Sequence, residues 1–143
     1  MRKITKEEQD LFQFTDAQVD NLEEHQVRLI KTGFDNLNKY QIVAEVVESK
    51  HCTWGAKVGD KIVMNGAGHL IPAKCSNPEK LCMWAVAKLL PFSYMFYDRA
   101  CSGLDPTGML FKRIKCEDPG VDDGGWGQIV MEVRAELVKP EGG

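Results

Sequence analysis

The chain has 143 residues, a formal net charge of −3 at pH 7 and a pI near 5.6. With 43% hydrophobic and 27% charged residues, it has the composition of one folded domain. No cluster of Lys and Arg offsets the acidic balance, which argues against nucleic-acid binding. The longest apolar run is far shorter than the roughly 20 residues that span a bilayer. We therefore expect neither nucleic acid nor a membrane as a partner.

The cysteines and the N-terminal segment indicate a reducing compartment. The N-terminal residues are charged and lack the apolar core of a signal peptide. Five cysteines form an odd set with irregular spacing and no Cys-x-x-Cys pair, so reduced thiols are favoured over a disulfide framework. These cysteines are Cys52, Cys75, Cys82, Cys101 and Cys116. We expect a cytoplasmic protein.

Residues 1–38 predict a helical N-terminal arm. Thr5 with Glu8, and Thr15 with Gln18, have the spacing of capping boxes. After Thr15, apolar residues recur in steps of three and four, which predicts an amphipathic helix over 16–37. Its apolar stripe must pack either on the sheet of the same chain or on another copy, and both remain open. We favour homo-oligomerisation through residues 16–37.

Residues 39–143 predict a single small α+β domain with the order β-β-α-β-β. β-Branched, alternating segments at 41–48, 61–64, 109–117 and 128–138 indicate strands. Asn77 and Pro78 suit the first positions of a central helix. This helix is apolar from Leu81 to Leu90, which predicts burial on most sides, and Pro91 is expected to end or kink it. An antiparallel or mixed sheet packed on one buried helix follows.

Four short motifs stand in order along residues 41–135. They are Cys52-x-x-Gly55-x-Lys57-x-Gly59-Asp60, Cys82-x-Trp84-Ala85, Leu90-Pro91-Phe92 and Cys116-x-Asp118-Pro119. In this order the chain resembles a family of small, conserved and uncharacterised bacterial and archaeal proteins. The resemblance implies a shared fold and a shared cysteine site, and it supplies no activity.

The chain departs from that family in several places. Ala56 stands where the family often has His, and Met83 where it often has Pro. The loop over 66–78 is longer, and residues 1–38 look like an addition. If the family's His is a ligand or a base, Ala56 removes that role here.

Three cysteines, Cys52, Cys82 and Cys116, are expected near one end of the sheet. With His51 or His69 as a fourth ligand, they would form a Cys₃His site for zinc or iron. Alternatively, Cys82 or Cys52 would act as a catalytic thiolate, because a helix N-terminus lowers a thiol pKa. Plain core packing, the commonest role of a free cysteine, is the third interpretation. The residues alone leave the three open.

Aromatic and polar residues around the helix indicate a ligand pocket. Aromatic side chains with a few polar tips are typical pocket linings, and cations near a helix start favour an anion. The expected ligand-binding residues are Trp84, Tyr94, Tyr97, Arg99, His69 and Lys74. Ordinary core packing and capping explain the same residues.

Three functions are consistent with these patterns. The favoured one is a small-molecule-binding or accessory protein with a cysteine-containing pocket at the N-terminal end of the central helix. The second is a small enzyme that uses a cysteine thiolate, or a cysteine-bound metal, on a small aromatic or carbonyl substrate. The third is a structural subunit of a larger enzyme. Because no catalytic triad, carboxylate pair or nucleotide loop is assigned, the enzyme hypothesis lacks a named reaction.

Overall fold

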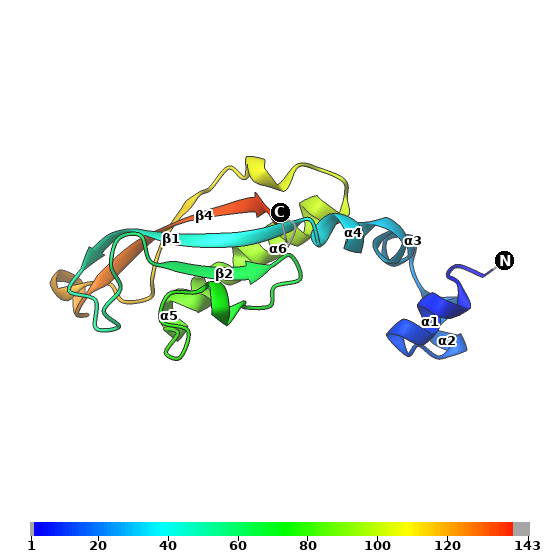
Figure 1. The fold of residues 1–143 in the computed structure, drawn as a ribbon, viewed down its shortest axis with the longest axis horizontal. Coiled ribbons are helices and arrows are strands. Elements are labelled where there is room, and N and C mark those ends of the chain that lie inside the picture. The colour runs from blue at the N-terminus through cyan, green and yellow to red at the C-terminus, as the bar shows by residue number, and fades with distance from the viewer. Residues whose placement is uncertain (1, 139–143) are drawn as a thin grey trace.

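A computed structural model describes residues 2–138 and shows an α+β fold. The strands are β1 (Tyr40–Lys50), β2 (Lys61–Asn65), β3 (Arg113–Lys115) and β4 (Gln128–Leu137). They form a four-stranded antiparallel sheet in the order β2-β1-β4-β3, with helix α6 (Leu90–Cys101) behind it in Figure 1. The predicted fold class is confirmed, and the sheet is antiparallel.

The two faces of the sheet have different chemistry. On the inner face, Ile42 lies opposite Ala135, and Val46 lies opposite Met131, all within the main core. On the outer face, the Glu45 carboxylate accepts a hydrogen bond from Arg134 at 3.1 Å and lies 3.8 Å from the Lys61 ammonium. The inner face therefore packs against the helices, while among the described residues of the other face only the Val43–Val63 pair of β1 and β2 adds to the core.

The edge of β2 is covered by the segment that follows it. The Ile71 N–H donates to the Val63 carbonyl (2.9 Å), and the Ser76 N–H donates to the Lys61 carbonyl (2.8 Å). Between them, the buried Cys75 Sγ accepts the Val63 N–H at 3.2 Å. The 3₁₀ turn η2 (Pro72–Lys74) lies in this segment. The long loop over 66–78 thus satisfies an otherwise open strand edge.

The central helix begins later than predicted. It runs through α5 (Met83–Val86), a 3₁₀ segment η3 (Ala87–Leu89) and α6. Cys82 is its N-cap, whereas Asn77 has φ +50° in the preceding turn. The Trp54 indole N–H donates to the Lys80 carbonyl and anchors that turn. Pro91 lies in the first turn of α6, where a missing N–H costs nothing, so the helix continues.

The helix is buried on one face only. Its buried side chains recur at steps of three and four, and they are Ala85, Leu89, Phe92, Phe96 and Ala100. Met83, Trp84, Leu90 and Tyr94 are each more than half exposed. The prediction of burial on most sides is wrong, because the sheet covers a single side of the helix and the arm residues Gly33 and Asn36 contact only the end of α6.

The N-terminal arm consists of short helices and not of one long one. They are α1 (Lys6–Phe12), α2 (Asp16–Asn21), α3 (Glu24–Arg28), a π-helical turn η1 (Leu29–Gly33) and α4 (Phe34–Leu37). Both predicted capping boxes, at Thr5 and at Thr15, are confirmed. The predicted continuous helix over 16–37 is wrong, because the backbone turns extended at Leu22 (ψ 132°).

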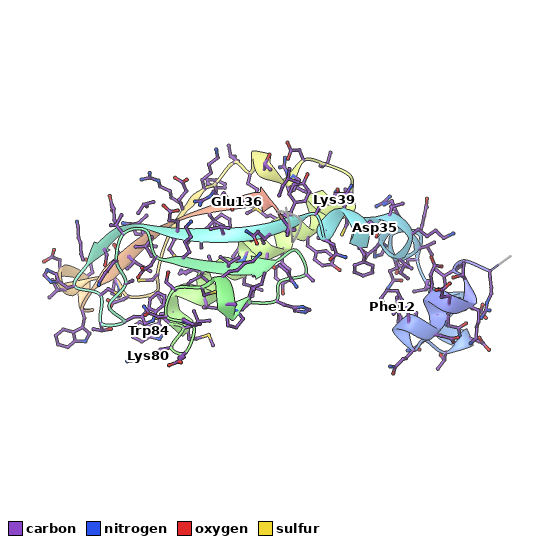
Figure 2. The ribbon with its side chains drawn as sticks, in the orientation of Figure 1. Phe12, Asp35, Lys39, Lys80, Trp84 and Glu136 are labelled. Atoms are coloured by element: carbon purple, nitrogen blue, oxygen red, sulfur yellow. The ribbon has the colours of Figure 1, made fainter. Side chains whose placement is uncertain are left out.

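A second, small core explains that break. Val19 and Leu22 are buried with Ile4 in a cluster separate from the main core, so the chain must turn at Leu22. Figure 1 shows α1 and α2 at the far end of the molecule from the β2–β4 sheet. Figure 2 places Phe12 there, and its ring stacks on that of Phe34 with centroids 5.6 Å apart.

The second half of the arm packs on the end of α6. Leu37 is fully buried in the main core, and the Asn36 amide donates to the Ala100 carbonyl at 2.6 Å. Gly33 faces Cys101 closely enough that a Cβ would lie 3.4 Å from the Cys101 Cα. Much of the apolar stripe is therefore covered within the chain, and oligomerisation through residues 16–37 stays a prediction.

The third strand is shorter than predicted. Of residues 109–117, only Arg113–Lys115 form strand β3, although the backbones of Lys112 and Cys116 also hydrogen-bond to β4. Two 3₁₀ turns, η4 (Pro106–Gly108) and η5 (Val121–Asp123), flank this region. Met109 is buried, whereas Leu110 and Phe111 are exposed. The tail predicted after residue 138 lies outside the described residues.

Candidate functional site

A cleft of about 680 Å³ lies beside β3, where the sheet passes the central helix. Its wall includes Cys116 and Glu117 after β3, Lys88 from η3, and Gln128 from β4. The backbone N–H of Glu117 donates to the Trp84 carbonyl (3.3 Å), which joins the end of β3 to α5. The cleft therefore lies next to the first turns of the central helix.

Cys116 is fixed in the wall of this cleft by backbone pairing. Its N–H donates to the Ile129 carbonyl at 3.2 Å, and its Sγ accepts the Ile129 N–H at 3.5 Å. The residue is partly buried and packs against the main core. The thiol is thus held at a defined position while one side of it faces the cleft.

Asp118 closes the loop that forms one rim of the cleft. Its carboxylate accepts backbone N–H groups from Trp126 (2.9 Å), Gly120 (3.0 Å) and Gly127 (3.1 Å). These hydrogen bonds, that of Trp126 first, hold the pKa of Asp118 below its ordinary value of 3.8. The Gln128 amide donates to the Asp118 carbonyl (3.1 Å). The Asp118 side chain thus fixes the turn that follows β3.

The cleft is lined by three cations, Lys88, Arg113 and Lys115, and by two carboxylates, Glu48 and Glu117. Lys88 forms an ion pair with Glu117 at 2.8 Å, and Arg113 lies 3.8 Å from Glu132. Lys115 lines the cleft and has no ion-pair partner among residues 2–138. Ile114 and Val130 add apolar wall. Glu117 neutralises Lys88, and Glu48 lines the same cleft, so the excess cation available to an organic anion comes from Arg113 and Lys115 on β3.

The other two predicted cysteines do not line this cleft. Cys52 and Cys82 are partly buried against the main core, and Cys82 makes no side-chain hydrogen bond to the helix it caps. Within residues 2–138, no group of three or more His, Cys, Asp or Glu side chains is placed to hold a metal ion. The described residues therefore do not gather Cys52, Cys82 and Cys116 into a metal-binding group, and the zinc or iron site stays a prediction.

The predicted ligand-binding residues are distributed over the molecule. His69 lies in the turn after β2, where its N–H donates to the Asn65 side chain at 2.9 Å. The Lys74 ammonium donates to the Gln41 amide oxygen at 2.8 Å. Because the helix begins at Met83, neither residue directly precedes it. Trp84 and Tyr94 lie on the exposed face of the helix.

Tyr97 and Arg99 lie near the other end of α6. Tyr97 packs against the core, and burial, followed by the neighbouring Cys101, raises its pKa above 10.0. The Arg99 Nε donates to the Asp105 carbonyl at 3.1 Å. Arg99 also lines a groove of about 300 Å³ together with Met95 and Phe111. The structure does not gather the six predicted residues into one pocket.

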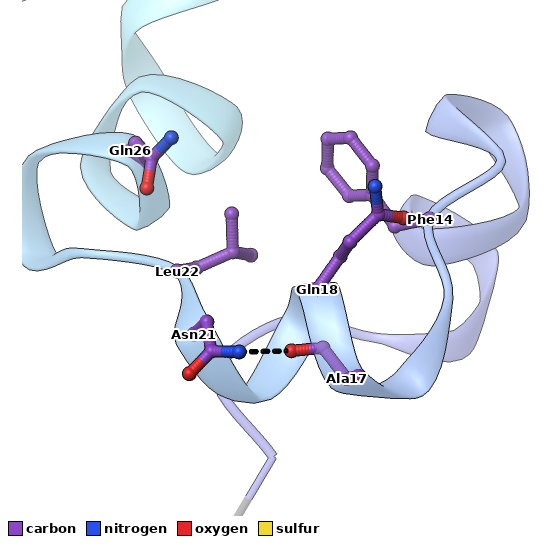
Figure 3. A pocket seen from close by; sticks show the side chains of 6 residues that line it. All are labelled: Phe14, Ala17, Gln18, Asn21, Leu22 and Gln26. Carbon is purple, nitrogen blue, oxygen red and sulfur yellow. Dashed lines mark hydrogen bonds between the residues drawn. The ribbon is translucent and has the colours of Figure 1, made fainter.

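A further hollow lies on the arm and is shown in Figure 3. It has a volume of about 360 Å³ and is lined by Phe14, Ala17, Gln18, Asn21, Leu22 and Gln26. The Asn21 amide donates to the Ala17 carbonyl across its floor (2.9 Å). Because none of these side chains titrates, this hollow offers no acid, base or nucleophile.

Sequence reasoning missed the cations of the cleft. Arg113 and Lys115 share one parity of a strand, and this alternation was visible in the sequence. Lys88 carried no comparable signal, since its place beside Glu117 depends on how α5 packs against β3. Only Cys116 was both predicted and found in the cleft.

Comparisons with known proteins assign neither a family nor a function to this chain. No family model, no curated protein and no solved structure matches the chain. The resemblance indicated by the cysteine and glycine motifs stays a prediction. Within residues 2–138, no helix combines the length and the apolar character that crossing a membrane requires.

Proposed function

We propose that this protein is a cytosolic small-molecule-binding or accessory protein that takes a small organic anion in the cleft beside Cys116. The observation that supports this most directly is that cations exceed carboxylates around one cleft: Lys88, Arg113 and Lys115 lie there with Glu48 and Glu117. A volume of about 680 Å³ lies within the range of small-molecule sites, roughly 300–1,000 Å³.

The arrangement favours an anion with an apolar body. Among the described residues, Lys115 forms no ion pair, and Arg113 lies 3.8 Å from the Glu132 carboxylate. Both cations are therefore available to a ligand. A guanidinium binds a carboxylate or a phosphate through two parallel hydrogen bonds. Ile114 and Val130 would contact the rest of the molecule. Five free thiols support a reducing compartment.

The test uses Cys116 as a reporter of cleft occupancy. Iodoacetamide labelling of each cysteine is followed by mass spectrometry at pH 8, with and without 5 mM sodium benzoate, sodium succinate or inorganic phosphate. We expect at least one organic anion to slow labelling of Cys116 severalfold while the other cysteines are unaffected. Protection by phosphate alone would point to a general anion site and contradict an organic ligand.

A double variant locates the effect. Arg113→Met with Lys115→Met should abolish the protection, because both cations of β3 are then lost. Lys57→Met is the matched control, since Lys57 is an exposed lysine in the loop between β1 and β2 and does not line the cleft. Equal protection in the double variant, or none by any compound in the unmodified protein, would refute the proposal.

Thiol catalysis by Cys82 or Cys52 stays a second proposal with less support. Neither residue lines the cleft, and both pack against the core. The same labelling data test this proposal, because a catalytic thiolate would react much faster near neutral pH than the other four cysteines. Uniformly slow labelling of Cys82 and Cys52 would leave packing as their role.

A further inference from the structure

The outer face of the central helix is apolar and exposed. Five large side chains lie along it, with exposed fractions of 69% for Met83, 55% for Trp84, 53% for Leu90, 68% for Tyr94 and 38% for Met95. A helix that is apolar on both faces is normally covered on both. The sheet covers only the face that carries Leu89 and Phe96.

Charge is sparse along this helix before Asp98 and Arg99, which lie near the end of α6. Between Leu81 and Tyr97 the only charged residue is Lys88, and its ammonium is held 2.8 Å from the Glu117 carboxylate at the β3 side. Solvated helix faces normally carry several charged residues. The outer face of this helix therefore has the composition of an interface and not of a solvent surface.

The apolar surface continues beyond the helix. Leu110 and Phe111, which are 86% and 68% exposed, line a groove together with Met95. Seven such side chains, each exposing roughly 100 Å², present on the order of 700 Å², which exceeds the largest apolar patch of most monomers. We call these seven residues the helix patch: Met83, Trp84, Leu90, Tyr94, Met95, Leu110 and Phe111.

We propose that the helix patch is the interface of a homodimer, in which it packs against the same patch of a second copy. Its area matches the roughly 800 Å² per partner that standard interfaces bury. Trp, Tyr, Phe and Met are enriched at the centre of interfaces, where charged residues are depleted. A twofold contact brings the two apolar faces together, and the charged residues that line the Met95 groove, Asp98 and Arg99, are of opposite sign.

The N-terminal arm of another copy is a poorer occupant. The apolar residues Ile4, Val19 and Leu22 of the arm are already buried in its own small core. Residues 1–38 carry eight acidic and five basic side chains, which an apolar patch would leave without partners. Figure 2 shows Phe12 of the arm far from Trp84 of the patch, which lies beside the sheet.

Sedimentation equilibrium of the full chain, from 1 to 200 μM, tests the dimer. The expected mass at high concentration is twice the chain mass of 16.1 kDa. Because the seam is apolar, 1 M NaCl should not weaken the dimer. A monomer at every concentration would overturn the proposal and would leave a partner of different sequence as the occupant.

Two variants locate the interface. Trp84→Glu with Tyr94→Glu should weaken dimerisation at least 100-fold, because four carboxylates would meet in the seam. Leu11→Glu is the matched control: Leu11 is 74% exposed on α1, outside the patch, so its variant should dimerise normally. A dimer that survives the double substitution, or one lost equally in the Leu11 variant, would refute the helix patch. Circular dichroism confirms that each variant is folded.

Discussion

Replacement of Gly127 by Ala tests how the cleft rim is attached to the sheet. A Cβ at Gly127 would lie 1.9 Å from the His51 carbonyl oxygen and 2.6 Å from the Cys52 nitrogen. Both neighbours are backbone atoms, so no rotamer change relieves the overlap. The φ angle of Gly127 is not positive, so the penalty is steric and not conformational. The substitution must therefore move the loop away from the end of β1.

The loss of stability expected for Gly127→Ala follows from these contacts. Overpacking against side chains costs about 1–3 kcal/mol, so displacement of backbone should cost about 3 kcal/mol or more. The shift also lengthens the hydrogen bond from the Gly127 N–H to Asp118, now 3.1 Å. For a domain of this size, such a loss lowers Tm by about 10 °C.

Gly124→Ala is the matched control. Gly124 lies in the same loop with φ +90°, and a Cβ added there would meet no atom within 4 Å, so only strain of about 1–2 kcal/mol applies. Urea unfolding followed by circular dichroism gives both free energies of unfolding. If the Gly127 variant is as stable as the Gly124 variant, the loop is not seated on His51 and Cys52, and the description of the rim is wrong.

Two pH-dependent measurements test the shifted pKa values of Asp118 and Cys101. Since the folded pKa of Asp118 is depressed below 3.8, its stabilisation is complete above that value and is lost as pH falls through the lower folded pKa. Asp118→Asn should therefore lower Tm at pH 7 and flatten the decline of Tm from pH 5 to pH 2, whereas parallel curves would contradict the carboxylate's role. Burial, followed by Asp98, raises the pKa of Cys101 above 9.0 against an opposing effect of Arg28, so the alkylation rate of Cys101 should rise with a midpoint above pH 9.0. A midpoint at or below 9.0 would show that this thiol is not shielded.

Local signals in the sequence predicted the local structure well. The capping boxes at Thr5 and Thr15 need only the side chains within one helical turn, and both form. Alternation over 41–48 and 128–138 indicated the two long strands, β1 and β4, because a half-buried strand must alternate. These features depend on neighbours a few residues away.

Other local signals were misleading because distant contacts outweighed them. Asn77 is a favourable N-cap by residue type, yet it adopts φ +50° in a turn while Cys82 caps the helix. The helical periodicity over 16–37 is real, but packing of Val19 and Leu22 on Ile4 interrupts the helix. In the second case the burial of apolar side chains outweighed the intrinsic preference of the backbone.

The sequence by itself determined the α+β class, the caps of the arm, the long strands and the unpaired state expected of five cysteines. Only the tertiary structure decided which residues line the cleft. The pairing of Ile114 with Met131 brings β3 beside β4, and the packing of α5 brings Lys88 to Glu117. Strand pairing and helix packing join residues far apart in the chain, and the register of such contacts is set by the burial of whole faces and not by any short pattern. Because the sheet covers only one side of the central helix, the helix patch on the other side stays exposed.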